Sequence, residues 1–249
     1  MENISEFRKA QEKNLKNVRG RTERTSPDGN YGVLRTSLEE YERHICGKKS
    51  ILDMVKKKRK AHPERPVAIL DFGCGENHAL RDLREKASDD LPIELTGWSV
   101  GDPRKEEDRA FDEAHTIKFI DQKNVTETPP PDSYDFIFSF MAFLHLPNPL
   151  QTLKKLYNAL RDDGELFVDI GPYLIEGKFV DDGDFYSLAG LHTVMEDMKK
   201  AGIDVESDKK HMVIRKNDKA LKFPSVTFSD EAKYNIKAGV YEIKKGTSN

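Results

Sequence analysis

The segment Asp71-Phe72-Gly73-Cys74-Gly75 has a residue order suited to holding a small ligand. It follows an apolar run typical of a buried strand, and a helical pattern begins directly after it. Glycines at such a turn let a ligand approach the backbone closely, because no Cβ stands in the way. The first turn of the following helix offers N–H groups that favour a carboxylate or phosphate. Asp71 is predicted either to meet a cationic part of the ligand or to brace the loop.

Several ligands use a glycine-rich turn of this kind, and some such turns serve only the close packing of a strand on a helix. A dinucleotide site requires G-x-G-x-x-G, but His78 stands where its third glycine belongs. The pattern D-x-G-x-G-x-G of a methyl-donor site fits at Asp71, Gly73 and Gly75, with Asn77 in place of the third glycine. Asparagine tolerates a left-handed backbone better than most other residues, so this replacement is mild.

Short apolar strands alternate with amphipathic helices from Val67 onward. The strands are predicted at 67–72, 93–100, 116–120, 134–141 and 165–170, with two further candidates around 211–215 and 239–244. Helices are predicted at 77–85, 106–114, 150–160 and 188–201, and glycines at 164 and 202 are expected to end the last two. This alternation predicts an α/β fold with a doubly wound, mostly parallel seven-stranded sheet.

The N-terminal part of the chain has a different pattern. Residues 1–62 are predicted to form a helical cap with helices at 34–45 and 50–60, preceded by about 25 residues of frayed helix or disorder. Residues 1–60 contain 16 basic and 9 acidic side chains, whereas the remaining residues contain 25 and 35. Part of the excess is the run Lys56-Lys-Lys-Arg-Lys60, which is interpreted as a solvated helix end. Contact with nucleic acid is the less favoured alternative, because no aromatic residues interleave with the run.

The composition excludes several classes of protein. The two cysteines, Cys46 and Cys74, are too few for a disulfide framework or a four-ligand zinc site. No apolar run approaches the ~20 residues that a membrane-spanning helix needs. The N-terminus lacks the apolar core of a secretory signal. We therefore expect a cytoplasmic protein with no metal site and no membrane contact.

The segment from Pro131 to Leu150, PDSYDFIFSFMAFLHLPNPL, resembles the fourth-strand motif of class I S-adenosylmethionine-dependent methyltransferases. Its continuation, Asn158-Ala-Leu-Arg-Asp-Asp-Gly-Glu-Leu-Phe167, resembles the step into the fifth strand of that family. The resemblance covers roughly 67–170. It implies a Rossmann-like domain, here 63–249, that binds S-adenosylmethionine. It carries no information on the methyl acceptor.

The resemblance also implies donor contacts. The loop residues assigned to the donor's methionine part are Gly73, Cys74 and Gly75, with Cys74 as a small filler. Asp71 would lie near the sulfonium end or hold the loop, and Phe140 and Met141 would line the sulfonium region. Ser99 stands where the family usually has an acid for the ribose hydroxyls, and it offers a weaker, uncharged hydrogen bond. Trp98 is predicted to flank the adenine or to be a core aromatic. The residues expected around the adenine are Asp121, Gln122, Asn124 and Val125.

Few side chains are candidates for chemistry beyond donor binding. His145 is the candidate general base for an acceptor that carries a proton, and a turn-capping role is the alternative. Tyr31 is predicted to close over the donor or to pack on the core. An Asn-Pro-Pro-Tyr signature is missing after the fourth strand, which argues against methylation of base or glutamine amino groups.

The interpretation is therefore a methyltransferase that acts on a small molecule. One alternative is a methyltransferase-like binding protein without catalysis. A second is an RNA methyltransferase that uses the basic N-terminal region, and an oxidoreductase that uses NAD is a distant third.

Overall fold

The computed structural model describes residues 37–99, 102–121, 127–142, 149–169, 198–207, 211–219, 234–235 and 240–241. The strands of the large sheet are β1 (Val67–Phe72), β2 (Ile93–Ser99), β3 (Ile117–Asp121), β4 (Tyr134–Ser139), β5 (Leu160–Asp169), β6 (Asp204–Ser207) and β7 (His211–Arg215). A two-stranded pair, β8 (Tyr234–Asn235) and β9 (Val240–Tyr241), is separate.

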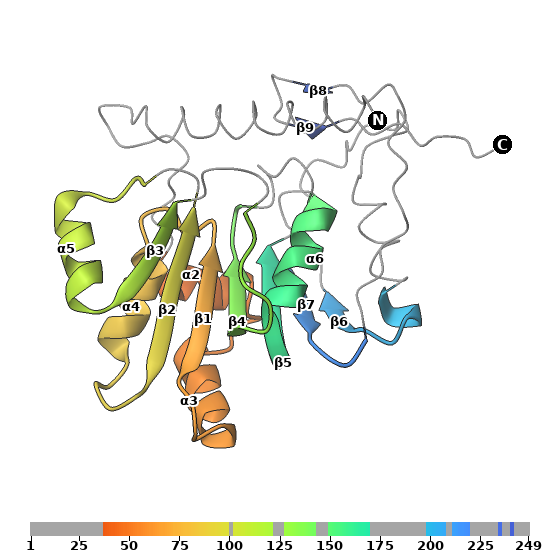
Figure 1. The fold of residues 1–249 in the computed structure, drawn as a ribbon, viewed down its shortest axis with the longest axis horizontal. Coiled ribbons are helices and arrows are strands. Elements are labelled where there is room, and N and C mark those ends of the chain that lie inside the picture. Colours follow the sequence, from red (N-terminus) through yellow and green to blue (C-terminus); the bar gives the residue numbers. More distant parts are fainter. Residues whose placement is uncertain are drawn as a thin grey trace.

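The large sheet has the strand order β3-β2-β1-β4-β5-β7-β6 (Figure 1). Strands β1 to β5 are parallel, and β7 runs antiparallel to both β5 and β6. The predicted doubly wound, mostly parallel seven-stranded sheet is confirmed.

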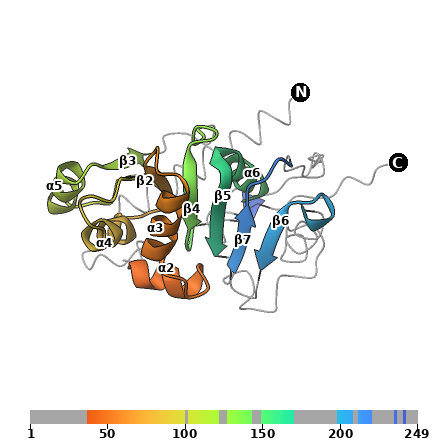
Figure 2. The same cartoon turned by 90° about the horizontal axis from the view of Figure 1, so that it is seen from below.

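The helices cover both faces of this sheet (Figure 2). They are α2 (Leu38–His44), α3 (Ile51–Ala61), α4 (His78–Lys86), α5 (Glu106–Ala114) and α6 (Pro149–Ala159). Because side chains alternate along a strand, the side chains of β1 pack into two cores, one on each face of the sheet. Val67 and Ile69 pack with α2, α3 and α4, whereas Leu70 and Phe72 pack with α6.

The N-terminal helices pack directly on the sheet. Leu38 and Tyr41 of α2 and Ile51 and Val55 of α3 are buried in the same cluster as the α4 face of β1. Ser37 begins α2 through a capping box, with its hydroxyl accepting from one backbone N–H of the first turn. The predicted helical cap thus contributes to the core in its described part, while a domain boundary at residue 62 stays a prediction.

The structure differs from the predicted elements around β5. This strand begins at Leu160 directly after α6, so Gly164 lies inside the strand and is not a helix cap. A Cβ at Gly164 would lie 2.9 Å from the Arg161 carbonyl oxygen and 3.1 Å from that of Tyr134. Glycine is needed here for a close backbone approach at the register shift between β4 and β5. Strand β6 was not predicted, because Val205 is the one apolar residue among its four.

The end of the predicted helix before Gly202 is confirmed in its described part. Gly202 has a φ of +79°, and its N–H donates to the Lys199 carbonyl. Among the described residues, no helix is both long and apolar enough to cross a membrane.

The amino edge of the sheet, where the parallel strands begin, contains a buried charge cluster. Oδ2 of Asp135 accepts hydrogen bonds from Arg65 Nη1 at 2.7 Å, Arg161 Nη1 at 2.8 Å and the Ala68 N–H at 2.9 Å. These contacts tie the first residues of β1, β4 and β5 together. They therefore stabilise the sheet at the edge opposite to the carboxyl edge, where the parallel strands end.

Candidate active site

The carboxyl ends of β1 and β4 are adjacent in the sheet, and the next helices, α4 and α6, pack on opposite faces. Ligands of open α/β sheets bind outside the strands at such a point. We call the residues that follow these two strands, 71–77 and 139–142, the β1–β4 junction. Two of the segments predicted to bind a methyl donor meet there.

The loop after β1 has an unusual backbone. Gly73, Gly75 and Asn77 have φ values of +84°, +54° and +67°. The N–H groups of Gly73 and Cys74 donate to the Trp98 carbonyl, at 2.6 and 3.4 Å. The loop is thereby tied to the end of β2 and turns at once into α4. The prediction that Asn77 takes a glycine-like conformation is confirmed.

The side chain of Asn77 fills space that the typical third glycine would leave empty. It is completely buried, and its Nδ2 donates to Asp112 at 3.0 Å. A Cβ at Gly97 of β2 would lie 1.9 Å from Asn77 Oδ1 and 2.8 Å from Cys74 Sγ. Asn77 and Gly97 are thus sterically matched across the strand–loop contact.

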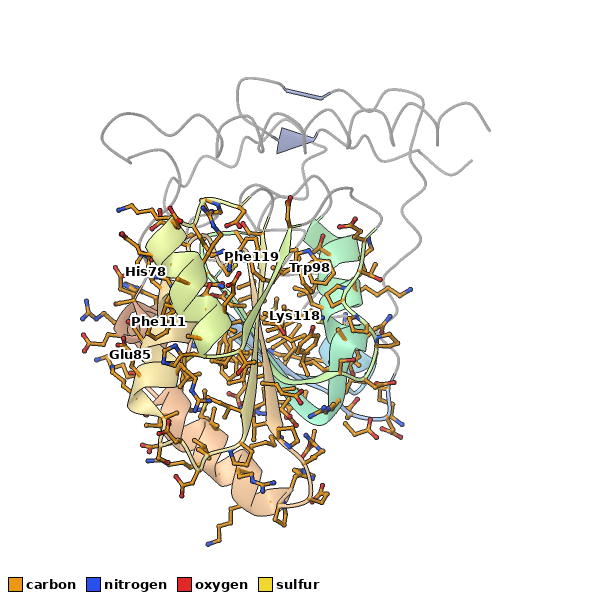
Figure 3. The ribbon with its side chains drawn as sticks, turned by 60° about the vertical axis from the view of Figure 1, so that its left-hand side comes forward. His78, Glu85, Trp98, Phe111, Lys118 and Phe119 are labelled. Carbon is orange, nitrogen blue, oxygen red and sulfur yellow. The ribbon has the colours of Figure 1, made fainter. Side chains whose placement is uncertain are left out.

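Asp112 connects this loop to α5. Besides Asn77, it accepts from Arg81 Nε at 3.1 Å and from Arg104 Nη1 at 2.8 Å. The Arg104 guanidinium lies 3.8 Å from the centre of the Phe119 ring. Figure 3 shows Phe119 on the side of the sheet that faces α5. The network fixes the loop after β1 relative to the segment after β2.

Asp71 is the buried acid at the end of β1. It lies on the same face as Val67 and Ile69, under α2, and is 1% exposed. The Tyr41 hydroxyl lies 2.9 and 3.0 Å from its two carboxylate oxygens and donates to them. Burial raises the pKa of Asp71 to about 7, and the Tyr41 hydrogen bond opposes part of that rise.

The segment after β4 also contacts α2. The Phe140 ring meets the Tyr41 ring edge-on, with centroids 5.4 Å apart, and stacks on His44 at 5.5 Å. Met141 has a φ of +58°, a conformation that an unbranched side chain adopts only at a cost. Such outliers concentrate at functional sites, and this one lies where the donor's sulfonium is predicted.

The two halves of the junction touch one another. Ser139 Oγ donates to the Phe72 carbonyl at 3.0 Å. A Cβ at Gly73 would lie 2.3 Å from Ala142 Cβ. The space beside Gly73 is therefore occupied by the segment after β4. A larger residue at Gly73 would disturb that packing whether or not a donor is bound.

The structure places the remaining described site residues as follows. Trp98 points toward α6 and is buried in that core, and its Nε1 has no hydrogen-bond partner among the described residues (Figure 3). This placement favours a core aromatic over an adenine contact. Burial raises the pKa of the Cys74 thiol well above its ordinary value, in keeping with a filler and not a nucleophile.

Ser99 and Asp121 end neighbouring strands at paired positions. In a parallel pair such residues lie about 4.8 Å apart and point to the same face. The hydroxyl and the carboxylate are therefore side by side at the carboxyl edge. The predicted site residues outside the described part of the chain are Tyr31, Gln122, Asn124, Val125 and His145.

Sequence reasoning missed Tyr41 as a site residue. In the predicted helix 34–45 it falls at helical spacing with Leu34, Leu38 and Ile45, as one residue of an apolar stripe. A signal existed, because a tyrosine on an otherwise aliphatic stripe needs a partner for its hydroxyl. That partner is 30 residues away in sequence, so no local pattern identifies it.

A profile of the family described as "Methyltransferase domain" matches residues 39–176, which is more than half of the chain. The chain belongs to this family and with it to the class I S-adenosylmethionine-dependent methyltransferases. The match spans α2 from its second residue, α3, both halves of the junction and β5.

Relatives with curated names are more distant. The tRNA U34 carboxymethyltransferase of Helicobacter acinonychis (strain Sheeba) is 31% identical over 107 residues, 41% of this chain and 39% of the relative. The protein of the same name from Helicobacter pylori (strain Shi470) is 29% identical over 123 residues, which are 47% of this chain and 44% of the relative. This chain thus spans about two fifths of the length of these curated relatives.

Solved structures with a similar fold include two methyltransferases. An S-adenosylmethionine-dependent methyltransferase from Mesorhizobium loti has a TM-score of 0.43 and 15% identity, over 65% of this chain and 96% of that one. The CurJ carbon methyltransferase has a TM-score of 0.48 and 14% identity, over 68% and 53%.

The described residues fit a nucleoside–methionine ligand. The left-handed loop at Gly73, Gly75 and Asn77 leads into the N-terminus of α4, which suits the carboxylate of a methionine part. Ser99 and Asp121 place a hydroxyl and a carboxylate where ribose and adenine contacts are predicted. The space beside Gly73 is smaller than expected, because Ala142 lies against this glycine.

Proposed function

We propose that the β1–β4 junction binds S-adenosylmethionine and that the protein transfers its methyl group to a small molecule. The observation that carries this proposal is the left-handed loop at Gly73, Gly75 and Asn77, placed at the switch point of the sheet and leading into α4. The family to which the chain belongs supports the methyl transfer and does not bear on the acceptor.

In this proposal the bound donor supplies an electrophilic methyl group, and the protein's residues align it and exclude water. The loop holds the methionine part, and Ser99 with Asp121 holds the nucleoside part. Phe140 offers an aromatic surface to the sulfonium region, which suits a cation. His145 remains the proposed general base for an acceptor that must lose a proton.

Thermal unfolding and calorimetry test donor binding. S-adenosylhomocysteine is expected to raise the melting temperature, because a ligand that binds only the folded state stabilises it by mass action. NADH is the matched control, since it contains adenosine but requires a different glycine pattern. A shift with NADH and none with millimolar S-adenosylhomocysteine contradicts the proposal.

The location of the basic run Lys56–Lys60 argues against an RNA acceptor that binds to this run. It therefore favours a small acceptor. Helix α3 ends just before β1 begins, so its basic last turns lie at the amino edge, away from the junction (Figure 1). Two of the five cations also have internal partners. Lys58 pairs with Asp163 at 3.2 Å, and Arg59 donates to the Arg65 carbonyl at 2.9 Å.

A tRNA acceptor is the second candidate, and the names of the curated relatives favour it. Radiolabel from methyl-labelled S-adenosylmethionine is to be followed into a small-molecule extract and into bulk tRNA, in parallel. Label in the small-molecule fraction supports the main proposal, and label in tRNA supports the second candidate. Replacing the exposed Lys56, Lys57 and Lys60 by Gln is expected to leave small-molecule labelling unchanged. A donor that binds tightly with no label transferred to either fraction indicates a non-catalytic binding protein.

A further inference from the structure

We propose that Tyr41 is a positioning residue for donor binding: its hydroxyl holds the Asp71 side chain and controls when that carboxyl is charged beneath the glycine loop. The inference rests on the proposed function, because it concerns the affinity for the same donor. It adds a residue of α2 to the predicted donor contacts.

The geometry of the pair is direct. The Tyr41 hydroxyl lies within 3.0 Å of both oxygens of Asp71, and both residues are at most 2% exposed. A hydroxyl has one proton to donate, so it compensates only part of the cost of burying a carboxylate. The side chain is therefore fixed in position while its charge remains adjustable.

Few other described groups act on the charge of Asp71. The strands on either side present Gly97 and Phe138 at the paired positions, and neither carries charge. On the following loop, Cys74 is kept protonated by burial. The pKa of Asp71 is accordingly governed by burial and by Tyr41, and it lies at about 7.

Several charged or titratable groups of the covering helices have other contacts. In α2, Glu40 accepts from the Ser37 N–H, Glu42 accepts from the Ile51 N–H, and His44 stacks on Phe140. In α4, Asp82 accepts from the Leu38 N–H, and Arg81 binds Asp112 and Asp108.

Tyr41 also touches the other half of the junction. Its ring meets Phe140 and Phe138 edge-on, at 5.4 and 6.4 Å between centroids. One side chain of α2 thus contacts the acid before the glycine loop and the aromatic residue after β4. A change at Tyr41 reaches both segments that are proposed to hold the donor.

The expected effect has a definite sign. S-adenosylmethionine carries a sulfonium and an ammonium, and a nearby carboxylate stabilises such cations strongly in a poorly solvated site. Donor affinity should therefore rise as Asp71 loses its proton. Removing the Tyr41 hydroxyl removes stabilisation of the charged form, so the rise should move to higher pH.

The test measures the affinity for S-adenosylmethionine by calorimetry between pH 6 and pH 8.5. Wild-type affinity is expected to rise about tenfold over this range, with a midpoint near the pKa of about 7. Tyr41→Phe should show the same rise at higher pH. Asp71→Asn should lack it and should report only the titration of the donor itself.

Tyr157→Phe is the matched control. Tyr157 is also a buried tyrosine, but its hydroxyl donates to the Lys219 carbonyl at 2.9 Å, on the α6 face. It should retain the wild-type midpoint. S-adenosylhomocysteine, which keeps the ammonium but lacks the sulfonium, identifies which cation responds to Asp71.

A second measurement is independent of the donor. Carboxyl ¹³C NMR of the unliganded protein should show Asp71 titrating near pH 7 and at higher pH in Tyr41→Phe. Normal donor binding with an unmoved midpoint in Tyr41→Phe, or with the wild-type rise retained in Asp71→Asn, overturns this inference alone. Absence of binding at every pH overturns it together with the proposed function.

Discussion

The two edges of the sheet each contain a buried aspartate, and the two aspartates differ in their hydrogen-bond partners. At the amino edge, one oxygen of Asp135 accepts hydrogen bonds from two arginines and a backbone N–H. At the carboxyl edge, Asp71 receives the Tyr41 hydroxyl and faces uncharged strand residues. Burial of a carboxylate is costly unless it is paired and hydrogen-bonded. Asp135 therefore serves as a charged structural tie, whereas Asp71 can gain or lose its proton near neutral pH.

The comparison separates stability from function. The amino edge joins the starts of three strands through charges of opposite sign. The carboxyl edge keeps an incompletely compensated acid beside a loop with left-handed residues. A group whose pKa is shifted toward neutrality beside such a loop is a candidate for function.

The largest expected effect concerns the dependence of stability on pH at Asp71. Its pKa is raised from 3.8 to about 7 on folding, so the unfolded chain loses this proton first. The contribution of Asp71 to stability is therefore greatest below pH 4, and it falls as pH rises to about 7, by on the order of 4 kcal/mol. Asp71→Asn should remove this decline.

Urea unfolding of wild type and Asp71→Asn at several pH values checks this effect. The difference between the two proteins should favour the variant increasingly up to pH 7 and then stay constant. Parallel stability curves would show that Asp71 does not titrate with a raised pKa.

The same substitution at the other edge should act in the opposite direction. Asp135→Asn leaves Arg65 and Arg161 without a full counter-charge, and removing one partner of a buried ion pair typically costs about 3–5 kcal/mol. The lower end, about 3 kcal/mol, is expected because both guanidinium groups keep some access to water. Urea unfolding at pH 7 measures it, and a loss below about 1 kcal/mol would mean that the cluster acts as a surface ion pair.

Local patterns predicted much of this fold. The strand Val67–Phe72 and the helix Glu106–Ala114 have the predicted bounds, because apolar periodicity and adjacent turn residues define them. The glycine loop and the left-handed Asn77 were also predictable from residue types alone.

Contacts between distant segments were not predictable. The pairing of Tyr41 with Asp71, the cluster around Asp135 and the role of Gly164 all depend on which strands are neighbours. A single sequence contains no such information. These are the features that distinguish the two edges of the sheet.

A smaller effect is expected where Asn77 meets Gly97. Gly97→Ala places a Cβ against Asn77 Oδ1, and overpacking of this kind costs about 1–3 kcal/mol. Asn77→Gly removes the obstructing side chain, so the double variant should recover part of that loss. Unfolding free energies of the two single variants and the double variant form a cycle. Additive losses would show that the two positions are not sterically matched.

The smallest expected effect is a gain in donor affinity at Ser99. Ser99→Asp restores the acid that the family usually places opposite the ribose. A charged hydrogen bond contributes about 1.5–3 kcal/mol and a neutral one roughly half of that. The neighbouring Asp121 offsets part of the gain through like-charge repulsion of about 0.2–1 kcal/mol. Calorimetry at pH 8 should therefore find S-adenosylhomocysteine bound about fivefold more tightly.

Ser133→Asp is the control for this effect. It adds the same charge at the amino edge, just before β4, and should leave the affinity unchanged. Equal affinities in the two variants would mean that Ser99 does not face the ribose, and that the carboxyl edge holds the nucleoside through other residues.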